Sequence, residues 1–305
     1  MDYKKIIINR SIRLRILKLL SFIPDSVMLK IQYRIKQGYS LDLQNPKRFT
    51  EKIQWLKLNN RKDIYHVMVD KARVKDYVAG IIGEQYIIPS YGIWYSFEDI
   101  DFDSLPEQFV LKTNTGGGGL NVVICKSKKD FNKEEARKKL VFKPGVTKKS
   151  SGREWPYENI KKCIIAEAYM QNNDDEELVD YKFYCFSGEP YYCQVISGRN
   201  SVETIDFYDM QWQHQEFIGL NPRGRHSVKN ADAKSNKPAT LSQMIEIARK
   251  LSHGQPFLRV DLYQVDNKVY FGEMTFFPAS GFGTFRPDEW DYKLGDLIKL
   301  NDIYI

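Results

Sequence analysis

The sequence reads Leu258-Arg259-Val260-Asp261-Leu262-Tyr263 and, a few residues later, Tyr270-Phe271-Gly272-Glu273-Met274-Thr275. Both runs alternate apolar and polar residues, which predicts two strands, over 257–263 and 268–276. The short turn at Asp266-Asn267 makes them antiparallel neighbours. Asp261 and Glu273 can then lie close together, which two carboxylates do when a cation or an arginine lies between them.

These paired carboxylates have two interpretations. Hard oxygen ligands of this kind suit Mg²⁺, which usually takes one or two carboxylates together with substrate phosphates. Alternatively, Arg259, on the same face as Asp261, pairs with a carboxylate on a solvated surface, where such ion pairs are abundant. The two strands by themselves leave both interpretations open.

A glycine-rich hairpin is predicted further upstream. Residues 109–112 form a strand ending in Lys112, residues 113–119 a turn containing Gly116, Gly117, Gly118 and Gly119, and residues 121–125 a returning strand. Successive glycines let backbone N–H groups point at an anion, and Lys112 can supply a charge to a phosphate. No Gly-Lys-Ser/Thr or GxGxxG motif is present, so a Walker A loop and a Rossmann loop are excluded. A flexible hairpin tip is the alternative.

Other charged residues interrupt apolar strands. Glu167 is the single charge in the run from Ile164 to Met170, and Asp180 and Lys182 share one face of the next strand. A charge in such a strand is costly unless it is paired or functional. Several of them in one chain indicate a common site.

The rest of the chain mixes helices and strands, as in an α+β protein. Helices are predicted over 12–23, 50–58, 63–78, 129–140 and 241–251, and further strands over 163–170, 179–186, 191–196 and 204–208. With 305 residues, 42% hydrophobic and 28% charged, the composition is that of a globular protein of two or three lobes. Four cysteines without CxxC spacing or a nearby histidine pair disfavour a zinc site. We expect buried, reduced thiols rather than a bridge between Cys185 and Cys193.

The formal charge of +7 comes from one end of the chain. Residues 1–36 contain nine basic and two acidic residues, and the remaining 269 residues are neutral. The neutral body disfavours a nucleic-acid-binding face. No apolar run is long enough for a membrane span or resembles a signal peptide.

The N-terminal segment is predicted to form a basic amphipathic helix. Apolar residues from Ile12 to Ile23 recur at helical spacing, opposite Arg10, Arg15 and Lys18. Such a helix either lies on an anionic membrane surface or docks on the body with its basic face in solvent.

Taken in chain order, these pieces resemble the ATP-grasp superfamily. The resemblance rests on Lys112, the glycine hairpin, Glu167, Lys182, Arg259-x-Asp261 and Glu273-x-Thr275. Four further segments are similar to the TupA-like branch, named for teichuronopeptide biosynthesis: residues 45–55, Asp70-Lys71, residues 153–157 and residues 282–287. The resemblance implies an α+β ATP-grasp fold. Its two α+β lobes, which are a small lid and a C-terminal mixed sheet, enclose ATP. The implied divisions are an N-terminal helical region (1–100), a lid subdomain (101–175) and a C-terminal subdomain (176–305).

The resemblance also implies a role for each site residue. Lys112 and Lys182 hold ATP phosphates, Thr115 and Gly116 to Gly119 form the loop over them, and Glu167 lies at the lid hinge near adenine and ribose. Asp261 and Glu273 bind Mg²⁺. Thr275 stands where many family members have an asparagine ligand. Arg259 stabilises the transferring phosphoryl group, and Lys182 is the second catalytic residue that the resemblance implies. Two loop arginines, Arg199 and Arg286, are weaker candidates for a substrate carboxylate.

The implied activity is that of an ATP- and Mg²⁺-dependent carboxylate–amine ligase. It joins an amino acid or similar amine to a sugar acid during surface polysaccharide assembly, in the cytoplasm or at the inner face of the membrane. A second hypothesis is a non-catalytic module that binds polyanions or membrane surfaces. A third is a glycosyltransferase, which has only Asp99-x-Asp101-x-Asp103 in its favour.

Overall fold

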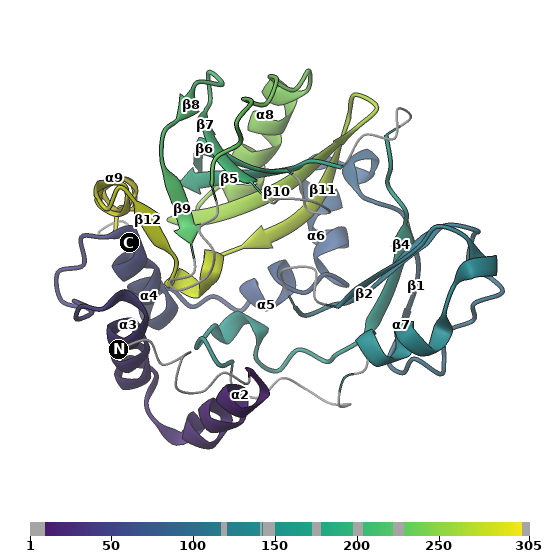
Figure 1. The fold of residues 1–305 in the computed structure, drawn as a ribbon, viewed down its shortest axis with the longest axis horizontal. Coiled ribbons are helices and arrows are strands. Elements are labelled where there is room, and N and C mark those ends of the chain that lie inside the picture. The colour runs from purple at the N-terminus through teal and green to yellow at the C-terminus, as the bar shows by residue number, and fades with distance from the viewer. Residues whose placement is uncertain are drawn as a thin grey trace.

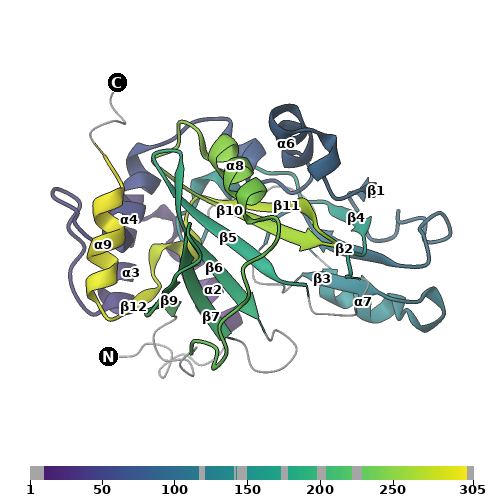
Figure 2. The ribbon, with the colours of Figure 1, turned by 90° about the horizontal axis from the view of Figure 1, so that it is seen from above.

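The computed structural model describes residues 10–116, 121–140, 142, 150–172, 178–197, 204–221 and 229–300. In these residues the chain forms a six-stranded sheet, a four-stranded sheet and a two-stranded ribbon, with helices around them (Figure 1). The view from above separates the four-stranded sheet, at one end, from α9 (Glu289–Leu297) at the other (Figure 2).

The six-stranded sheet is antiparallel throughout and has the order β11-β10-β5-β6-β7-β8. Its strands are β5 (Asp180–Phe186), β6 (Glu189–Ser197), β7 (Thr204–Asp209), β8 (His214–Gln215), β10 (Phe257–Val265) and β11 (Lys268–Thr275). The predicted turn joins β10 to β11 with Asp266 and Asn267 both at positive φ, as a tight two-residue hairpin requires.

Helix α8 (Leu241–Ser252) covers one face of this sheet. Its apolar side is buried in the main core, and the thiol of Cys185 on β5 reaches the carbonyl of Ala248 on the helix. Because side chains alternate along a strand, Lys182 on β5 and its register partner Asp261 on β10 point to the opposite face. The helix therefore fixes which face of the sheet carries the charges.

The four-stranded sheet has the order β1-β4-β2-β3, and we call it the lid sheet. Its strands are β1 (Ser90–Trp94), β2 (Phe109–Thr113), β3 (Val122–Cys125) and β4 (Ile164–Ala168). One face packs on α7 (Lys133–Leu140) through a core that includes Phe109, Leu111 and Ala166. Lys112 and Glu167 alternate with these residues and therefore point away from α7. The expected division near residue 100 stays a prediction, although β1, before it, pairs with β4.

The N-terminal part contains helices α2 (Arg10–Leu19), α3 (Asp25–Gln37), α4 (Phe49–Asn59), α5 (Tyr65–Met68) and α6 (Val74–Ile82), with the short 3-10 helix η1 (Leu20–Phe22) between α2 and α3. Two findings differ from the sequence-based expectation. Helix α3 was not predicted. The helix expected over 63–78 is interrupted, because Asp70 accepts hydrogen bonds from the backbone N–H of Ala72 and from the side chain of Asn114, which fold residues 69–73 into a turn.

The remaining described elements are short helices and a two-stranded ribbon. They are the 3-10 helices η2 (Glu84–Tyr86), η3 (Lys128–Asp130), η4 (Trp155–Tyr157) and η5 (Pro278–Gly281), and the ribbon of β9 (Ile218–Asn221) with β12 (Thr284–Arg286). Helix α9 packs on α4. All four cysteines are buried and free, which confirms the expectation of reduced thiols. Among the residues described, no helix has the length and apolar character needed to cross a membrane.

Candidate functional site

Asp261 lies at the centre of a buried charge cluster on the six-stranded sheet. It stands opposite Lys182 on one side and Glu273 on the other. Its Oδ2 lies 2.5 Å from Lys182 Nζ and 2.7 Å from Arg259 Nη2, and its Oδ1 lies 2.7 Å from Arg259 Nε. Burial alone would raise the pKa of Asp261, but the charges of Arg259 and Lys182 outweigh it and hold that pKa below its ordinary value. Asp261 is therefore an ionised carboxylate held by two cations.

Arg259 does pair with a carboxylate, as one interpretation of the sequence predicted, but on a buried face rather than a solvated one. Its fork grips Asp261 of its own strand, and Nη2 also donates to Thr275 Oγ1 at 3.0 Å. Asp180, on the same face of β5 as Lys182, lies 3.4 Å from Lys182 Nζ. We call these four residues the sheet cluster (Asp180, Lys182, Arg259 and Asp261). Its two carboxylates balance its two cations.

Glu273 connects the sheet cluster to the glycine hairpin through Lys71. The Glu273 side chain is 26% exposed, and its Oε1 lies 3.4 Å from Lys71 Nζ. The same ammonium donates to the carbonyl of Gly116 at 2.8 Å. In the sequence, Lys71 stands out only through the similarity to the family branch. Its place in the turn before α6 explains why no strand pattern pointed to it.

A second charge cluster lies on the lid sheet, and we call it the lid cluster (Lys75, Lys112 and Glu167). Lys112 Nζ lies 2.5 Å from Glu167 Oε2, and Lys75 Nζ lies 2.7 Å from Glu167 Oε1. Lys75, on α6, also donates to the carbonyl of Ile88. Burial alone would raise the pKa of Glu167, but Lys112 and then Lys75 outweigh it and lower that pKa. One carboxylate faces two lysines, so this cluster has an excess positive charge.

The start of the glycine turn is held by the side chains of Asn114 and Thr113. Asn114 is fully buried, donates to Asp70 Oδ1 and to the carbonyl of Lys161, and accepts from the N–H of Cys163. Thr115 accepts a hydrogen bond from Thr113 Oγ1 through its carbonyl. Gly116 has a φ of +140°, which a residue with a side chain rarely adopts. Gly117, Gly118 and Gly119 lie outside the described residues.

The oxygen donors near Asp261 fit Mg²⁺ only together with ligands from a substrate. No group of three or more His, Cys, Asp or Glu side chains that could hold a metal occurs among the described residues. Asp261, Glu273 and the hydroxyl of Thr275 are hard oxygen donors on adjacent strands. Two carboxylates completed by phosphate oxygens and water are the set that Mg²⁺ prefers.

Neither Arg286 nor the Asp99-x-Asp101-x-Asp103 segment is part of the two clusters. Arg286 ends β12, where its register partner is Ile218, and its side chain is exposed. Arg199 lies outside the described residues. In the Asp99-x-Asp101-x-Asp103 segment, Asp101 Oδ1 accepts from the backbone N–H of Asp103, so this carboxylate stabilises an exposed turn.

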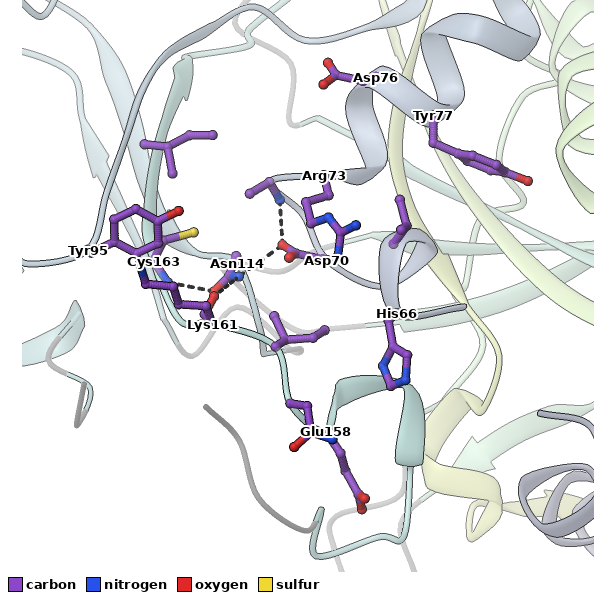
Figure 3. Close-up of a pocket in the computed structure, with 15 residues that line it drawn as sticks. His66, Asp70, Arg73, Asp76, Tyr77, Tyr95, Asn114, Glu158, Lys161 and Cys163 are labelled. Carbon is purple, nitrogen blue, oxygen red and sulfur yellow. Dashed lines mark hydrogen bonds between the residues drawn. The ribbon is translucent and has the colours of Figure 1, made fainter. Parts of the chain in front are cut away.

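A cavity of about 770 Å³ borders the contact between Asp70 and Asn114 (Figure 3). Arg73, Tyr95 and Lys161 line it together with these two residues, whereas the sheet cluster and the lid cluster do not. Acidic and basic side chains are mixed around it, so its lining does not select one ligand charge. The two charge clusters therefore lie outside this cavity.

Comparisons with known proteins give a family and a set of distant structural similarities. No curated protein matches the chain. Among solved structures, it is similar to D-alanine–D-alanine ligase from Bacillus anthracis, with a TM-score of 0.45 and 18% identity over 78% of this chain and 68% of that one. It is also similar to D-alanine–D-alanine ligase from Helicobacter pylori (TM-score 0.41, 14% identity, 83% and 70% covered) and to a RimK domain ATP-grasp protein from Sphaerobacter thermophilus (TM-score 0.41, 10% identity, 91% and 96% covered).

The family comparison extends over most of the chain. The family described as TupA-like ATPgrasp matches residues 51–299, a range that contains β1 to β12 and both charge clusters. The α+β architecture agrees with that match. The chain therefore belongs to the TupA-like ATP-grasp family and has the ATP-grasp fold.

Proposed function

We propose that the protein is an ATP-dependent carboxylate–amine ligase. The observation that carries this proposal is the Lys71 bridge, which brings the glycine hairpin of the lid against Glu273 and thus next to Asp261. Phosphoryl transfer needs positioning and charge neutralisation more than a strong base. The lysines and the arginine around this point supply both.

In the first proposed step, an oxygen of a substrate carboxylate attacks the γ-phosphorus of ATP, and ADP leaves with the bridging oxygen. Lys112 and Lys182 bind phosphate oxygens, and Arg259 stabilises the charge on the transferring phosphoryl group. Mg²⁺, held by Asp261 and Glu273 with Thr275 beside them, would neutralise phosphate charge. Glu167 would hold Lys112 in place at the hinge of the lid.

In the second step, an amine attacks the carbonyl carbon of the acyl phosphate. Inorganic phosphate leaves, a proton is released from the amine nitrogen, and an amide remains. The lysines and the arginine of the site hold the two substrates in line. The closed site excludes water, which would otherwise hydrolyse the acyl phosphate.

For the substrates we propose a sugar-acid carboxylate and an amino acid or similar amine, joined in the cytoplasm during surface polysaccharide assembly. Membership of the TupA-like family supports this choice. The neutral charge of residues 37–305 is compatible with a small-molecule substrate and gives no support to a nucleic-acid partner.

The test is ADP release from ATP and Mg²⁺ with pairs of sugar acids and amino acids. We expect release to require both members of a pair, and Glu273→Gln to lower it by about 100-fold or more. Glu189→Gln, which removes an exposed carboxylate from the same sheet, is the matched control and should retain full activity.

Two results would contradict the proposal. One is Glu273→Gln activity near that of the wild type in an active pair. The other is the absence of both ADP release and a thermal shift with MgATP, which would favour the non-catalytic binding module.

A further inference from the structure

An exposed apolar surface runs along the N-terminal helices. It consists of seven large side chains on α2, η1 and α3: Ile12, Ile16, Leu19, Phe22, Val27, Ile31 and Ile35. We call these residues the N-terminal apolar surface. Leu19 is 76% exposed and Phe22 is 80% exposed, although both are large hydrophobic residues. If α2 were docked on the body by its apolar stripe, as one sequence-based hypothesis held, these residues would be covered.

Helix α3 contributes because it is apolar on two faces. Met28, Leu29 and Tyr33 are buried against the rest of the protein. Val27, Ile31 and Ile35 follow one another at intervals of four residues, so they form a separate stripe, and all three are exposed. One face of α3 therefore anchors the helix, while the other presents isoleucine and valine to solvent. Exposed apolar residues gathered in this way mark interaction sites rather than ordinary surface.

Positive charge surrounds the same helices. The chain's formal charge of +7 is contained in residues 1–36. Arg15 on α2 and Lys30 and Arg34 on α3 are exposed beside the apolar side chains. The one acidic residue in α3, Asp25, is paired with Arg61 and Arg153. The surface thus combines large apolar side chains with an excess of cations.

We propose that the N-terminal apolar surface docks on an anionic phospholipid bilayer, with its apolar side chains among the acyl chains near the headgroups. Amphipathic helices with basic flanks bind membranes in this way, by apolar burial together with attraction to anionic lipid. A second copy of this chain is disfavoured, because a symmetric contact would place two strongly positive segments against each other. The proposal does not depend on the proposed ligase activity.

The docking helices are joined firmly to the region of the charge clusters. Arg153 is 3% exposed and donates to the carbonyls of Leu20 and Ser21 and to Asp25, so it holds the turn between α2 and α3. It lies just before η4, where burial and then the charge of Glu273 raise the pKa of Tyr157. Helix α3 and the lid sheet lie at opposite ends of the molecule in both views (Figures 1 and 2). Docking through α3 would therefore leave the lid sheet away from the bilayer.

The test is co-sedimentation of the full chain with vesicles of phosphatidylcholine alone or with about 30% phosphatidylglycerol. We expect binding to the anionic vesicles only, weakened by about 0.5 M salt. Leu19→Ser/Phe22→Ser and Ile31→Asp should each reduce the partition coefficient by about tenfold or more. The matched control is Ile81→Asp, an exposed isoleucine on α6, which should bind like the wild type. Circular dichroism verifies that each variant is folded.

Several results would overturn the proposal. They are failure of the wild type to bind anionic vesicles, equal binding to neutral vesicles, and equal loss in Ile31→Asp and Ile81→Asp. A lipid-free dimer that dissociates in the Leu19→Ser/Phe22→Ser variant would assign the surface to a second copy instead. Vesicle binding that appears only after deletion of residues 1–9 would mean that the chain's own N-terminus covers the N-terminal apolar surface.

Discussion

The lid cluster and the sheet cluster both pair carboxylates with cations, but their charge balance differs. In the lid cluster, Glu167 faces Lys75 and Lys112, which leaves one excess positive charge. In the sheet cluster, Asp180 and Asp261 balance Lys182 and Arg259. The lid cluster also joins two elements, α6 and the lid sheet, whereas the sheet cluster lies within one sheet. We infer that the lid cluster can bind a phosphate anion without a further cation. The sheet cluster is balanced, so it needs a bound cation before it can bind a phosphate.

Removing the central carboxylate of the sheet cluster should have the largest effect. Asp261→Asn removes the carboxylate that pairs with Arg259 and leaves Lys182 with Asp180 alone, at a site that is 2% exposed. We expect the free energy of unfolding, measured with urea, to fall by about 3–5 kcal/mol. Glu189→Gln, which breaks a pair with Arg249 on the exposed surface, is the control and should cost less than about 1 kcal/mol. Similar losses in the two variants would show that the sheet cluster is no stronger than a surface pair.

The second prediction separates the two lysines of the lid cluster. Lys112→Met should weaken MgATP binding by about 10–100-fold in calorimetry, because a charged hydrogen bond contributes roughly 1.5–3 kcal/mol. Lys75→Met should change the affinity by less than about threefold, because Lys75 also binds the carbonyl of Ile88 and so links α6 to the chain before β1. Equal losses would remove the distinction between a phosphate ligand and a structural lysine.

The third prediction concerns the carboxylate of the lid cluster. Glu167→Gln should lower the free energy of unfolding by about 1–3 kcal/mol at pH 7, less than Asp261→Asn, because both lysines can still reach water. The pKa of Glu167 is lowered from 4.5, so the wild type's advantage is complete above about pH 4.5 and disappears as the pH falls through the lowered value. Urea unfolding of both proteins at several pH values measures it. An advantage that persists unchanged in acid would contradict the assignment.

The fourth prediction uses a buried cation outside both clusters. Lys57 is fully buried and donates to the carbonyls of Gly152 and Ser280 and to Ser280 Oγ, which are neutral acceptors. Burial lowers its pKa from 10.5 to about 7, although the charge of Glu154 opposes this. Between these values the unfolded chain binds the proton more strongly than the folded one, so stability should rise with pH, by at most about 1.4 kcal/mol per unit.

The comparison for Lys57 is the variant Lys57→Met. Thermal unfolding from pH 7 to pH 9 should show a wild-type stability that increases relative to that of the variant. Parallel curves would mean that Lys57 keeps the same charge over this range. That result would contradict the expectation for a buried lysine whose acceptors are neutral.

Local patterns predicted how the strands of Asp261 and Glu273 pair. The alternation of β10 and β11, with a two-residue turn between them, was sufficient to place Asp261 opposite Glu273. Alternation also placed Asp180 and Lys182 on one face of β5, but the pairing of β5 with β10 was not predicted. Such inferences succeed because register in a hairpin depends on nearby residues. The roles of these residues in ATP binding stay predictions.

Contacts between distant segments were not predictable in the same way. Lys71 and Lys75 come from a region expected to be one continuous helix, yet Asp70 pairs with Asn114 and breaks it. Helix α3 escaped prediction because apolar residues on two faces blur the 3.6-residue pattern.

The sequence by itself determined which residues carry charge in apolar strands, where the glycines follow a lysine, and that the excess charge lies in residues 1–36. It also carried the family resemblance that the comparison confirmed. The tertiary structure alone decided that Lys71 joins the glycine hairpin to Glu273, that Lys75 completes the lid cluster, and that α3 leaves an apolar stripe exposed. The physical reason is that strand periodicity and hairpin turns are local, whereas ion pairs between segments and the burial of one helix face depend on how the whole chain packs.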